Sequence, residues 1–295
     1  MKKKVILCLC MAVAMMFTAC NKDQDGVYNP TKKIKKIYSV ENGVQQVEEV
    51  WHWDGNLLNS IDLYEGGQFN STTTFKYDGS RLTTLQSAYS HAKFYYKGKK
   101  IDRVEVYYTG FEEPIGLYLF DYKGNKLSRI YMEFDMSSFI DKKALVNPLK
   151  YILPASCSKV ENLIAQHENE AKEYKESMTM QFTWTGNNVT SIILIEENTF
   201  GDATNTVTSF NQCTFDNKEN PVKGFISALF GATNIENFYC NKNNILKITT
   251  TQDDIEYYTT ENVYEYEDNY PVKVISTFSD NIGNWMLVST TIYEY

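Results

Sequence analysis

The feature that most constrains the fold is a short unit that recurs along most of the chain. Each unit has two aromatic residues two positions apart, a polar turn that usually contains glycine, and two aliphatic residues three positions apart. One copy runs from Phe75 to Gly79 and continues to Leu82 and Leu85. The clearest copies begin at Trp51, Phe75, Phe94, Phe120 and Phe182, and drifted copies begin at Cys213, Phe238 and Tyr264.

The physics of this unit predicts a β-hairpin. Aromatic residues at positions i and i+2 lie on the same face of a strand. Asp-Gly and Lys-Gly pairs tolerate positive φ and close tight turns, after which the aliphatic residues begin the return strand. Eight units and a last half-unit at Tyr293–Tyr295 predict about 16 antiparallel strands. An all-β meander of this length must curl into a barrel-like or strongly curved sheet, or shield its two edges.

One long interruption of the repeat predicts a helical insertion at residues 136–180. Apolar residues such as Val160, Leu163 and Ile164 recur there at helical spacing. Ser158 and Glu161 form a plausible capping box just upstream of that pattern. We therefore expect one repeat domain over residues 33–295 with this insertion inside it.

The first 19 residues are typical of a secretory signal. Three lysines precede an apolar run from Val5 to Ala19, which is short for a membrane span of about 20 residues. The run ends in Phe17-Thr18-Ala19-Cys20, which resembles the lipobox of bacterial lipoproteins. The resemblance implies removal of residues 1–19, lipid on Cys20 and attachment to a membrane. The alternative is an ordinary cleaved signal with a chance cysteine.

The residues after Cys20 bear on location. Asn21 stands where an aspartate would resemble an inner-membrane retention signal, so the resemblance implies an outer-membrane lipoprotein. The stretch from Lys22 to Asp25 is similar to the acidic tract that sends some Bacteroidetes lipoproteins to the cell surface, although a solvated linker is equally consistent with it. The protein would then face either the periplasm or the outside. Residues 20–32 are interpreted as the lipidated N-terminus and a flexible linker.

With the signal and repeats together, the chain resembles a family of Bacteroidetes lipoproteins of unknown function. The units are similar to the tyrosine–aspartate repeats of wrapping shells in bacterial toxins. The resemblance covers most of residues 33–295 and implies a porin-like fold, which is a closed or nearly closed antiparallel β structure. It implies no activity, so no functional residues follow from it.

The charge of the chain excludes one class of partner. It carries 29 basic and 37 acidic residues, and removal of residues 1–19 takes away three lysines, which leaves 26 against 37 and a net charge of −11. Nucleic-acid binding needs a clustered positive surface, so we expect no nucleic-acid partner. The same balance argues against adhesion to anionic lipid by charge alone.

Motifs for catalysis and for metal binding are missing from the sequence. His52, His91 and His167 are not at metal-ligand spacing from one another or from a cysteine. No nucleophile elbow, phosphate loop, dinucleotide fingerprint or zinc-protease motif is present, so we expect no metal and no cofactor. Carboxylates are plentiful but no pair stands out. The sequence therefore favours a non-catalytic protein.

Two cysteines occupy unit positions that elsewhere hold aromatic residues. Cys213 and Cys240 should face the same side as those aromatics, in nearby repeats. They either form a disulfide or remain as two buried thiols.

The large number of aromatic residues in the chain suggests a surface that binds a ligand. Tyr and Trp on a curved sheet stack against sugar rings, whereas regular spacing is also typical of core packing. The candidate stacking residues are Tyr107, Tyr108, Trp184, Tyr257, Tyr258 and Trp285. Our leading hypothesis is a binding module for a glycan, a peptide or a partner protein. The alternatives are a carboxylate-dependent hydrolase with a cleft near the 136–180 insertion, and a structural component of an envelope assembly.

Overall fold

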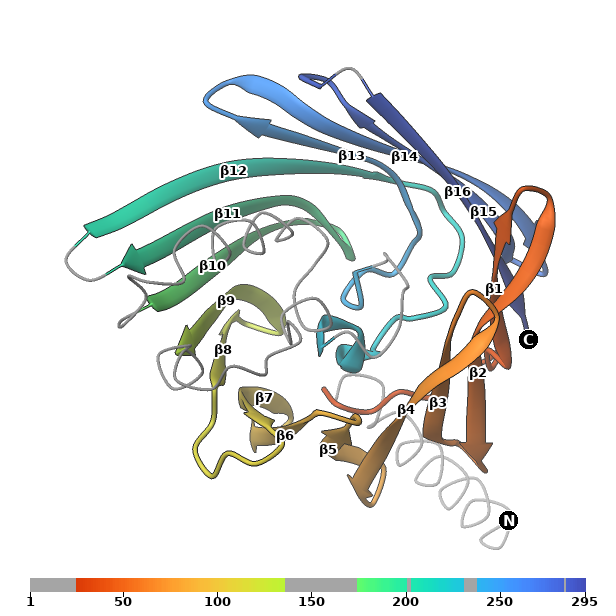
Figure 1. The fold of residues 1–295 in the computed structure, drawn as a ribbon, viewed down its shortest axis with the longest axis horizontal. Helices are drawn as coiled ribbons and strands as arrows, with labels where there is room; N and C mark the ends of the chain where they lie inside the picture. The colour runs from red at the N-terminus through yellow and green to blue at the C-terminus, as the bar shows by residue number, and fades with distance from the viewer. Residues whose placement is uncertain (1–24, 136–173, 201–202, 231–237, 284) are drawn as a thin grey trace, which may run out of the picture.

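The computed structural model describes residues 25–135, 174–200, 203–230, 238–283 and 285–295. Sixteen strands pair antiparallel, each with its neighbours in the sequence, and β1 pairs with β16 to close a barrel (Figure 1). The predicted all-β meander of about 16 strands is therefore confirmed, and its closure is complete. The strands are β1 Lys36–Glu41, β2 Val44–Asp54, β3 Leu57–Glu65, β4 Gln68–Asp78, β5 Arg81–Gln86, β6 Ser90–Lys97, β7 Lys100–Tyr108, β8 Gly116–Lys123, β9 Lys126–Asp135, β10 Tyr174–Thr185, β11 Asn188–Phe200, β12 Ala203–Phe215, β13 Ile245–Gln252, β14 Ile255–Glu267, β15 Tyr270–Asp280 and β16 Trp285–Glu294, with a short 3-10 helix, η3, at Ile226–Phe230.

The predicted helical insertion falls mostly outside the described residues, and its described end is a strand. Residues 174–180 belong to β10, which pairs with β9. Met178 and Met180 are buried while Lys175 is exposed and Ser177 and Thr179 are half-buried, which is the two-residue period of a strand. Within the described part of the chain, no helix is both long and apolar enough to cross a membrane.

The core lies inside the barrel, and the outer faces of β7 and β10 are polar. On β7, Val104 and Val106 are buried, whereas Arg103 and Glu105 alternate with them and face outward. On β10, Met180 and Phe182 point inward between polar outer residues. This alternation assigns the apolar side of each repeat to the interior.

The turns of the repeat units gather at one end of the barrel, which we call the repeat-turn end. In an up-and-down barrel every second connection lies at the same end, and the unit turns lie in alternate connections. The copies at Cys213 and Phe238 share the β12–β13 connection, so the separate hairpin predicted for Phe238 is wrong. The glycines of five of these turns have φ between 54° and 64°, which suits the first central position of a type II′ hairpin turn. They are Gly55, Gly79, Gly98, Gly124 and Gly186.

In four of the five clear copies, the second aromatic of the unit bonds a backbone carbonyl of the segment before its hairpin. It lies at a β-bulge in every clear copy, as in the register shift between Lys76 and Tyr77. The Tyr77 hydroxyl donates to the Leu58 carbonyl at 2.8 Å. Equivalent bonds run from Trp53 to Ile34, from Tyr96 to Leu82 and from Trp184 to Leu127. In the fifth clear copy, the Tyr122 hydroxyl donates to the Asp25 carboxylate. Each of the five positions therefore uses a side-chain donor, which Tyr and Trp have and Phe lacks.

Two irregular segments fill the barrel at the repeat-turn end. Barrels of eight strands are filled by their own side chains, whereas one of 16 strands leaves space inside. Figure 1 shows η3 and its flanking loops, from the β12–β13 connection, lying within the ring of strands. The second segment is the chain from Asp25 to β1. Tyr28 is its buried centre, with its ring 4.8 Å from that of Phe225 and its hydroxyl bonded to the Pro221 carbonyl.

This packing corrects the predicted linker at residues 20–32. Gly26 and Tyr28 are buried, and Tyr28 packs against Trp51 and Trp53 inside the barrel, whereas Asn29 and Thr31 are exposed. The described part of the predicted spacer is therefore packed against the barrel around Tyr28.

Candidate functional site

Three aromatic rings form a row across the inner face of the last three strands, at the end opposite the repeat turns. Tyr258 on β14, Phe278 on β15 and Trp285 on β16 have successive ring centroids 5.3 Å apart. The ring planes are inclined by 29° and 40°. We call this row the aromatic ladder.

Strand register explains how the ladder forms. Tyr258 pairs with Asp280, and Asp280 pairs with Trp285, so each ring is a diagonal neighbour of Phe278. Diagonal positions on adjacent strands are within reach of large aromatic side chains. The ladder shares its face with the buried Val274, which lies four positions before Phe278 on β15. The rings therefore belong to the wall of the barrel interior.

The ladder is open to solvent because the filling segments lie at the other end of the barrel. Trp285 is 50% exposed, against 4% for Trp51 on the inner face at the repeat-turn end. Hydroxyl residues share the inner face with the rings, since Thr260 pairs with Phe278 and Ser276 pairs with Ser289. Apolar ring faces bordered by a few hydroxyl groups are typical of a small-molecule or sugar site.

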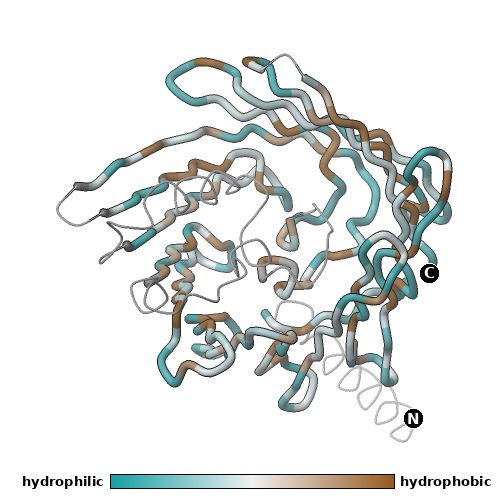
Figure 2. The backbone as a smooth tube through the Cα atoms, viewed as in Figure 1, coloured by the Kyte–Doolittle hydropathy of each residue, from teal (hydrophilic) through white to brown (hydrophobic). Residues whose placement is uncertain are grey.

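The outer face of the same strand ends is also apolar. Met286 and Val288 on β16 and Val263 on β14 are 66%, 53% and 66% exposed. Figure 2 shows brown stretches running along β14–β16, where these residues lie. Exposed apolar patches on both faces of one sheet are typical of an interaction surface.

The structure brings together three of the six predicted stacking residues. Tyr258 and Trp285 are in the ladder, and the Tyr257 ring lies 6.1 Å from that of Tyr258. Tyr257 is the extra residue of a β-bulge at the start of β14. Phe278 completes the row and was missed by the sequence analysis. The sequence feature that indicates Phe278 is its two-residue spacing from Val274 and Ser276, which places it on the core face of its strand.

The other three predicted residues lie elsewhere and are committed to packing. Tyr107 is 8% exposed, stacks on His91 at 4.7 Å and donates to Glu105. Tyr108 packs edge-on against Phe111 and the core. Trp184 is held by its bond to the Leu127 carbonyl.

An organised polar cluster lies on the outer faces of β6 and β7. Glu105 accepts hydrogen bonds from Tyr95 at 2.7 Å, from Tyr107 at 2.8 Å and from Arg103 at 3.0 Å. Burial raises the pKa of the Glu105 carboxyl, but these three bonds together bring that pKa below its usual value. Burial and the bond to Glu105 raise the pKa of Tyr107 to about 12. The cluster therefore keeps an ionised carboxylate, paired with the Arg103 guanidinium, and two neutral phenols on the barrel exterior at neutral pH.

A groove of about 1020 Å³ follows the seam where β1 meets β16. Three carboxylates line it, those of Glu265, Glu267 and Glu294. Glu265 is paired with Lys273 at 2.7 Å, and Glu294 accepts a bond from the Tyr38 hydroxyl at 2.6 Å. That bond and partial burial raise the pKa of Tyr38 to about 12. The Tyr38–Glu294 bond joins β1 to β16, whereas the Glu265–Lys273 pair joins β14 to β15.

Both cysteines of the predicted pair are free thiols. Cys213 is buried and Cys240 is half-buried, so the disulfide is not formed and the alternative of two packed thiols holds. Burial raises the pKa of Cys213 to about 11 and also raises that of Cys240. Protonated, enclosed thiols behave as small apolar side chains.

The described residues contain no cluster of three His, Cys, Asp or Glu side chains able to hold a metal ion. His52 bonds Asp62 at 2.7 Å on the barrel exterior, and His91 stacks on Tyr107. His167 and the cleft predicted near the insertion lie outside the described residues. In comparisons with known proteins, no family model matches this chain, and no curated protein matches it.

Proposed function

We propose that this chain is a non-catalytic outer-membrane lipoprotein that binds a glycan on the aromatic ladder. The observation that carries the proposal is the row of Tyr258, Phe278 and Trp285 on one sheet face, in which Trp285 is exposed and the other two rings are half-buried. The signal segment and the lipobox-like sequence ending at Cys20 support an envelope location. The charged outer row of Arg103 and Glu105 supports a barrel surrounded by water, because a strand face against lipid needs an apolar band.

The chemistry of the ladder favours sugar rings. The C–H face of a pyranose is apolar and stacks on an aromatic face, while neighbouring serine and threonine hydroxyls bond the sugar hydroxyls. The net charge of −11 on the processed chain repels polyanions, so the ladder is expected to select neutral glycans.

The test is a binding measurement on the domain that begins at residue 21. A neutral-glycan array identifies ligands, and calorimetry then compares the wild type with Trp285→Ala and Tyr258→Ala. Each variant should bind at least about tenfold more weakly, because a lost stacking contact is worth roughly 1.5 kcal/mol. Phe69→Ala is the matched control, since Phe69 is an aromatic of 60% exposure away from the ladder. Binding that survives both ladder substitutions would refute the proposal.

The outer apolar surface supports a second candidate, a structural role in an envelope assembly. Met286 and Val288 are exposed on the face opposite the ladder, where they meet no part of the described barrel. Val288→Asp should then reduce the mass of cross-linked complexes recovered from native envelopes and leave glycan binding intact. Trp285→Ala should have the reverse pattern, so the two roles are separable.

A further inference from the structure

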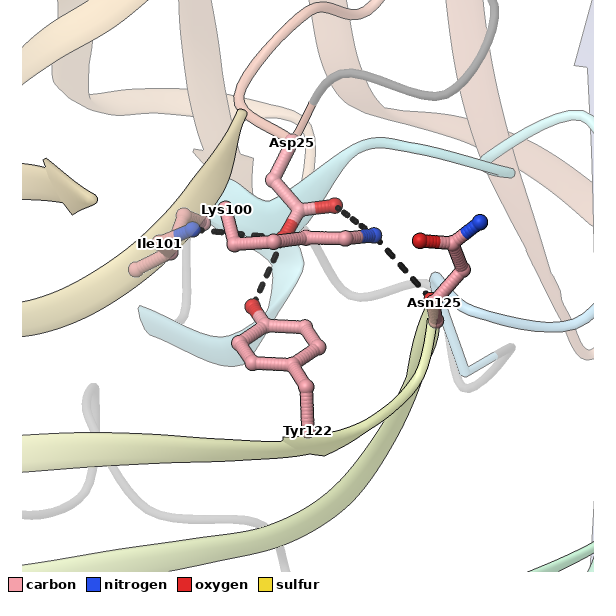
Figure 3. A network of polar contacts seen from close by, with 5 residues as sticks. All are labelled: Asp25, Lys100, Ile101, Tyr122 and Asn125. Carbon is pink, nitrogen blue, oxygen red and sulfur yellow. Dashed lines mark hydrogen bonds and ion pairs between the residues drawn. The ribbon is translucent and has the colours of Figure 1, made fainter. Parts of the chain in front are cut away.

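Asp25 lies in a polar network at the repeat-turn end of the barrel. The carboxylate of Asp25 accepts bonds from the Tyr122 hydroxyl at 2.6 Å and the Ile101 amide at 3.2 Å, and it lies 3.6 Å from the Lys100 ammonium (Figure 3). The Asp25 amide donates to the Lys99 carbonyl. Lys100 also donates to the Asn125 carbonyl, in the neighbouring turn. Asp25 is therefore clamped between the β6–β7 and β8–β9 hairpin tips.

The chain runs inward directly after this clamp. The Gly26 carbonyl accepts the Leu82 amide at 2.8 Å, and two residues later Tyr28 is buried. A Cβ on Gly26 would lie 2.0 Å from the Tyr96 hydroxyl, so the chain passes closely against the wall. Residue 25 is thus a fixed exit point at the rim of the repeat-turn end.

The exit point limits how far the barrel can lie from a lipid on Cys20. Five residue steps separate Cys20 from Asp25, and an extended chain spans at most about 3.5 Å per residue, or roughly 17 Å in all. This step rests on the proposed lipidation of Cys20. Given that lipid, the repeat-turn end is the end that faces the bilayer.

The rim next to the exit point is basic, although the chain as a whole is acidic. Residues 97–100 and 123–126 form the two hairpin tips that clamp Asp25, and they contain no acidic residue. Lys97, Lys99, Lys123 and Lys126 are exposed there. We call these four lysines and Lys100 the tether patch. A net charge describes the whole surface, whereas a bilayer within a Debye length of about 10 Å responds to the charges that face it.

We propose that the tether patch is a membrane-contact surface that binds the headgroups of anionic phospholipids beside the lipid on Cys20. The number of residues between Cys20 and Asp25 and the charge of the rim both favour the same end of the barrel. Lys100 and Lys126 also bond neighbouring turn carbonyls, which fixes the tips in place. In this orientation the aromatic ladder faces away from the membrane, toward a ligand arriving from solution.

The test uses the full lipidated chain reconstituted into phosphatidylcholine vesicles with or without phosphatidylglycerol. A fluorophore is placed at Asn125→Cys, in the β8–β9 turn at the repeat-turn end, or at Ile282→Cys, in the β15–β16 turn at the opposite end, and both positions are exposed. The chain also contains Cys157, which is changed to Ser so that it is not labelled. A headgroup-attached nitroxide then reports proximity to the bilayer. We expect strong quenching at position 125, weak quenching at position 282, and an increase at position 125 when phosphatidylglycerol is present.

The role of charge is tested by Lys97→Gln with Lys126→Gln, which should abolish the increase caused by phosphatidylglycerol. Lys175→Gln with Lys247→Gln removes two positive charges elsewhere and should leave it unchanged. Equal quenching at both positions, or an increase that persists without Lys97 and Lys126, would overturn the proposal. The mass of the purified protein reports lipidation of Cys20, and its absence would remove the premise of the orientation. Glycan binding in solution is independent of these readouts, so failure of one proposal is distinguishable from failure of the other.

Discussion

The two ends of the barrel use the same residue types in opposite ways. At the repeat-turn end Trp51 is 4% exposed and packs on Tyr28 and Phe225, whereas at the other end Trp285 is 50% exposed. The repeat supplies glycine turns and aromatic fastenings at only one end, so that end is regular and filled. The connections at the other end vary in length and are free of this constraint. The contrast separates a part of the molecule that maintains the fold from a part available for binding.

The largest expected effect comes from removing a ring at the filled end. Trp51→Ala should lower the free energy of unfolding by about 3–5 kcal/mol, because it creates a large cavity in the core. It also removes the Trp51 donor from the fully buried Glu49 carboxylate. Urea denaturation followed by circular dichroism measures the change. A loss below about 1 kcal/mol would contradict the contrast between the ends, since a ring lost from an exposed site has that size of effect.

A smaller effect is expected from one fastening bond. Tyr77→Phe keeps the ring but leaves the buried Leu58 carbonyl without its donor, which costs about 1–3 kcal/mol. Tyr89→Phe is the control, because Tyr89 is 64% exposed and removal of its hydroxyl should change the free energy of unfolding by less than about 0.5 kcal/mol. Equal unfolding midpoints for the two variants would show that the hydroxyl bond does not join the hairpins.

At the end opposite the repeat turns, one substitution should affect ligand binding strongly and stability only slightly. Trp285→Ala should change the free energy of unfolding by less than about 1 kcal/mol, because half of the ring is already in water. The same variant should lose glycan binding. Thermal and urea unfolding measure the first quantity, and calorimetry measures the second. If Trp285→Ala destabilised the barrel as strongly as Trp51→Ala, the ladder would be a core element.

The smallest effect is the pH dependence of a single thiol. Burial raises the pKa of Cys213 to about 11 from about 9, so the folded state retains the proton longer than the unfolded chain. Its contribution to stability is complete below pH 9 and is lost as the pH rises toward 11. Iodoacetamide labelling mapped by peptide mass should be negligible at Cys213 at pH 8. A cysteine placed at the exposed Ser289 should react readily at the same pH, and similar rates at both would remove the distinction.

The regular part of this fold could be predicted from sequence because its signals are local. The period-two aromatics and Gly79 mark a hairpin within a dozen residues, without reference to the rest of the chain. The segments that fill the barrel interior could not be predicted in this way, because their burial depends on contacts between distant parts of the chain. Val222 and Phe225 lie in an irregular loop whose sequence has no period, and they are buried only because a 16-stranded ring surrounds them. The polar context of Asp25 indicated a linker, yet its carboxylate binds two hairpin tips.

The candidate site could be predicted in part for a similar reason. Tyr258 and Trp285 were identified by residue type, whereas Phe278 joins them through the register of three strands. Register depends on bulges and turn lengths, which a composition argument does not capture. Residue type also indicates Tyr107 as a stacking residue, but in the structure its hydroxyl donates to Glu105 on the outer face.

The seam between β1 and β16 governs how this chain acquires its structure. Only four residue pairs join the two strands, and the Tyr38–Glu294 bond spans 256 positions. Contacts of such long range are costly in loop-closure entropy and slow to form. Until β16 has formed, the edge of β1 that faces it has no partner strand. The ring therefore closes late, and β16, the strand that bears Trp285, is the last of the sixteen to find its partner.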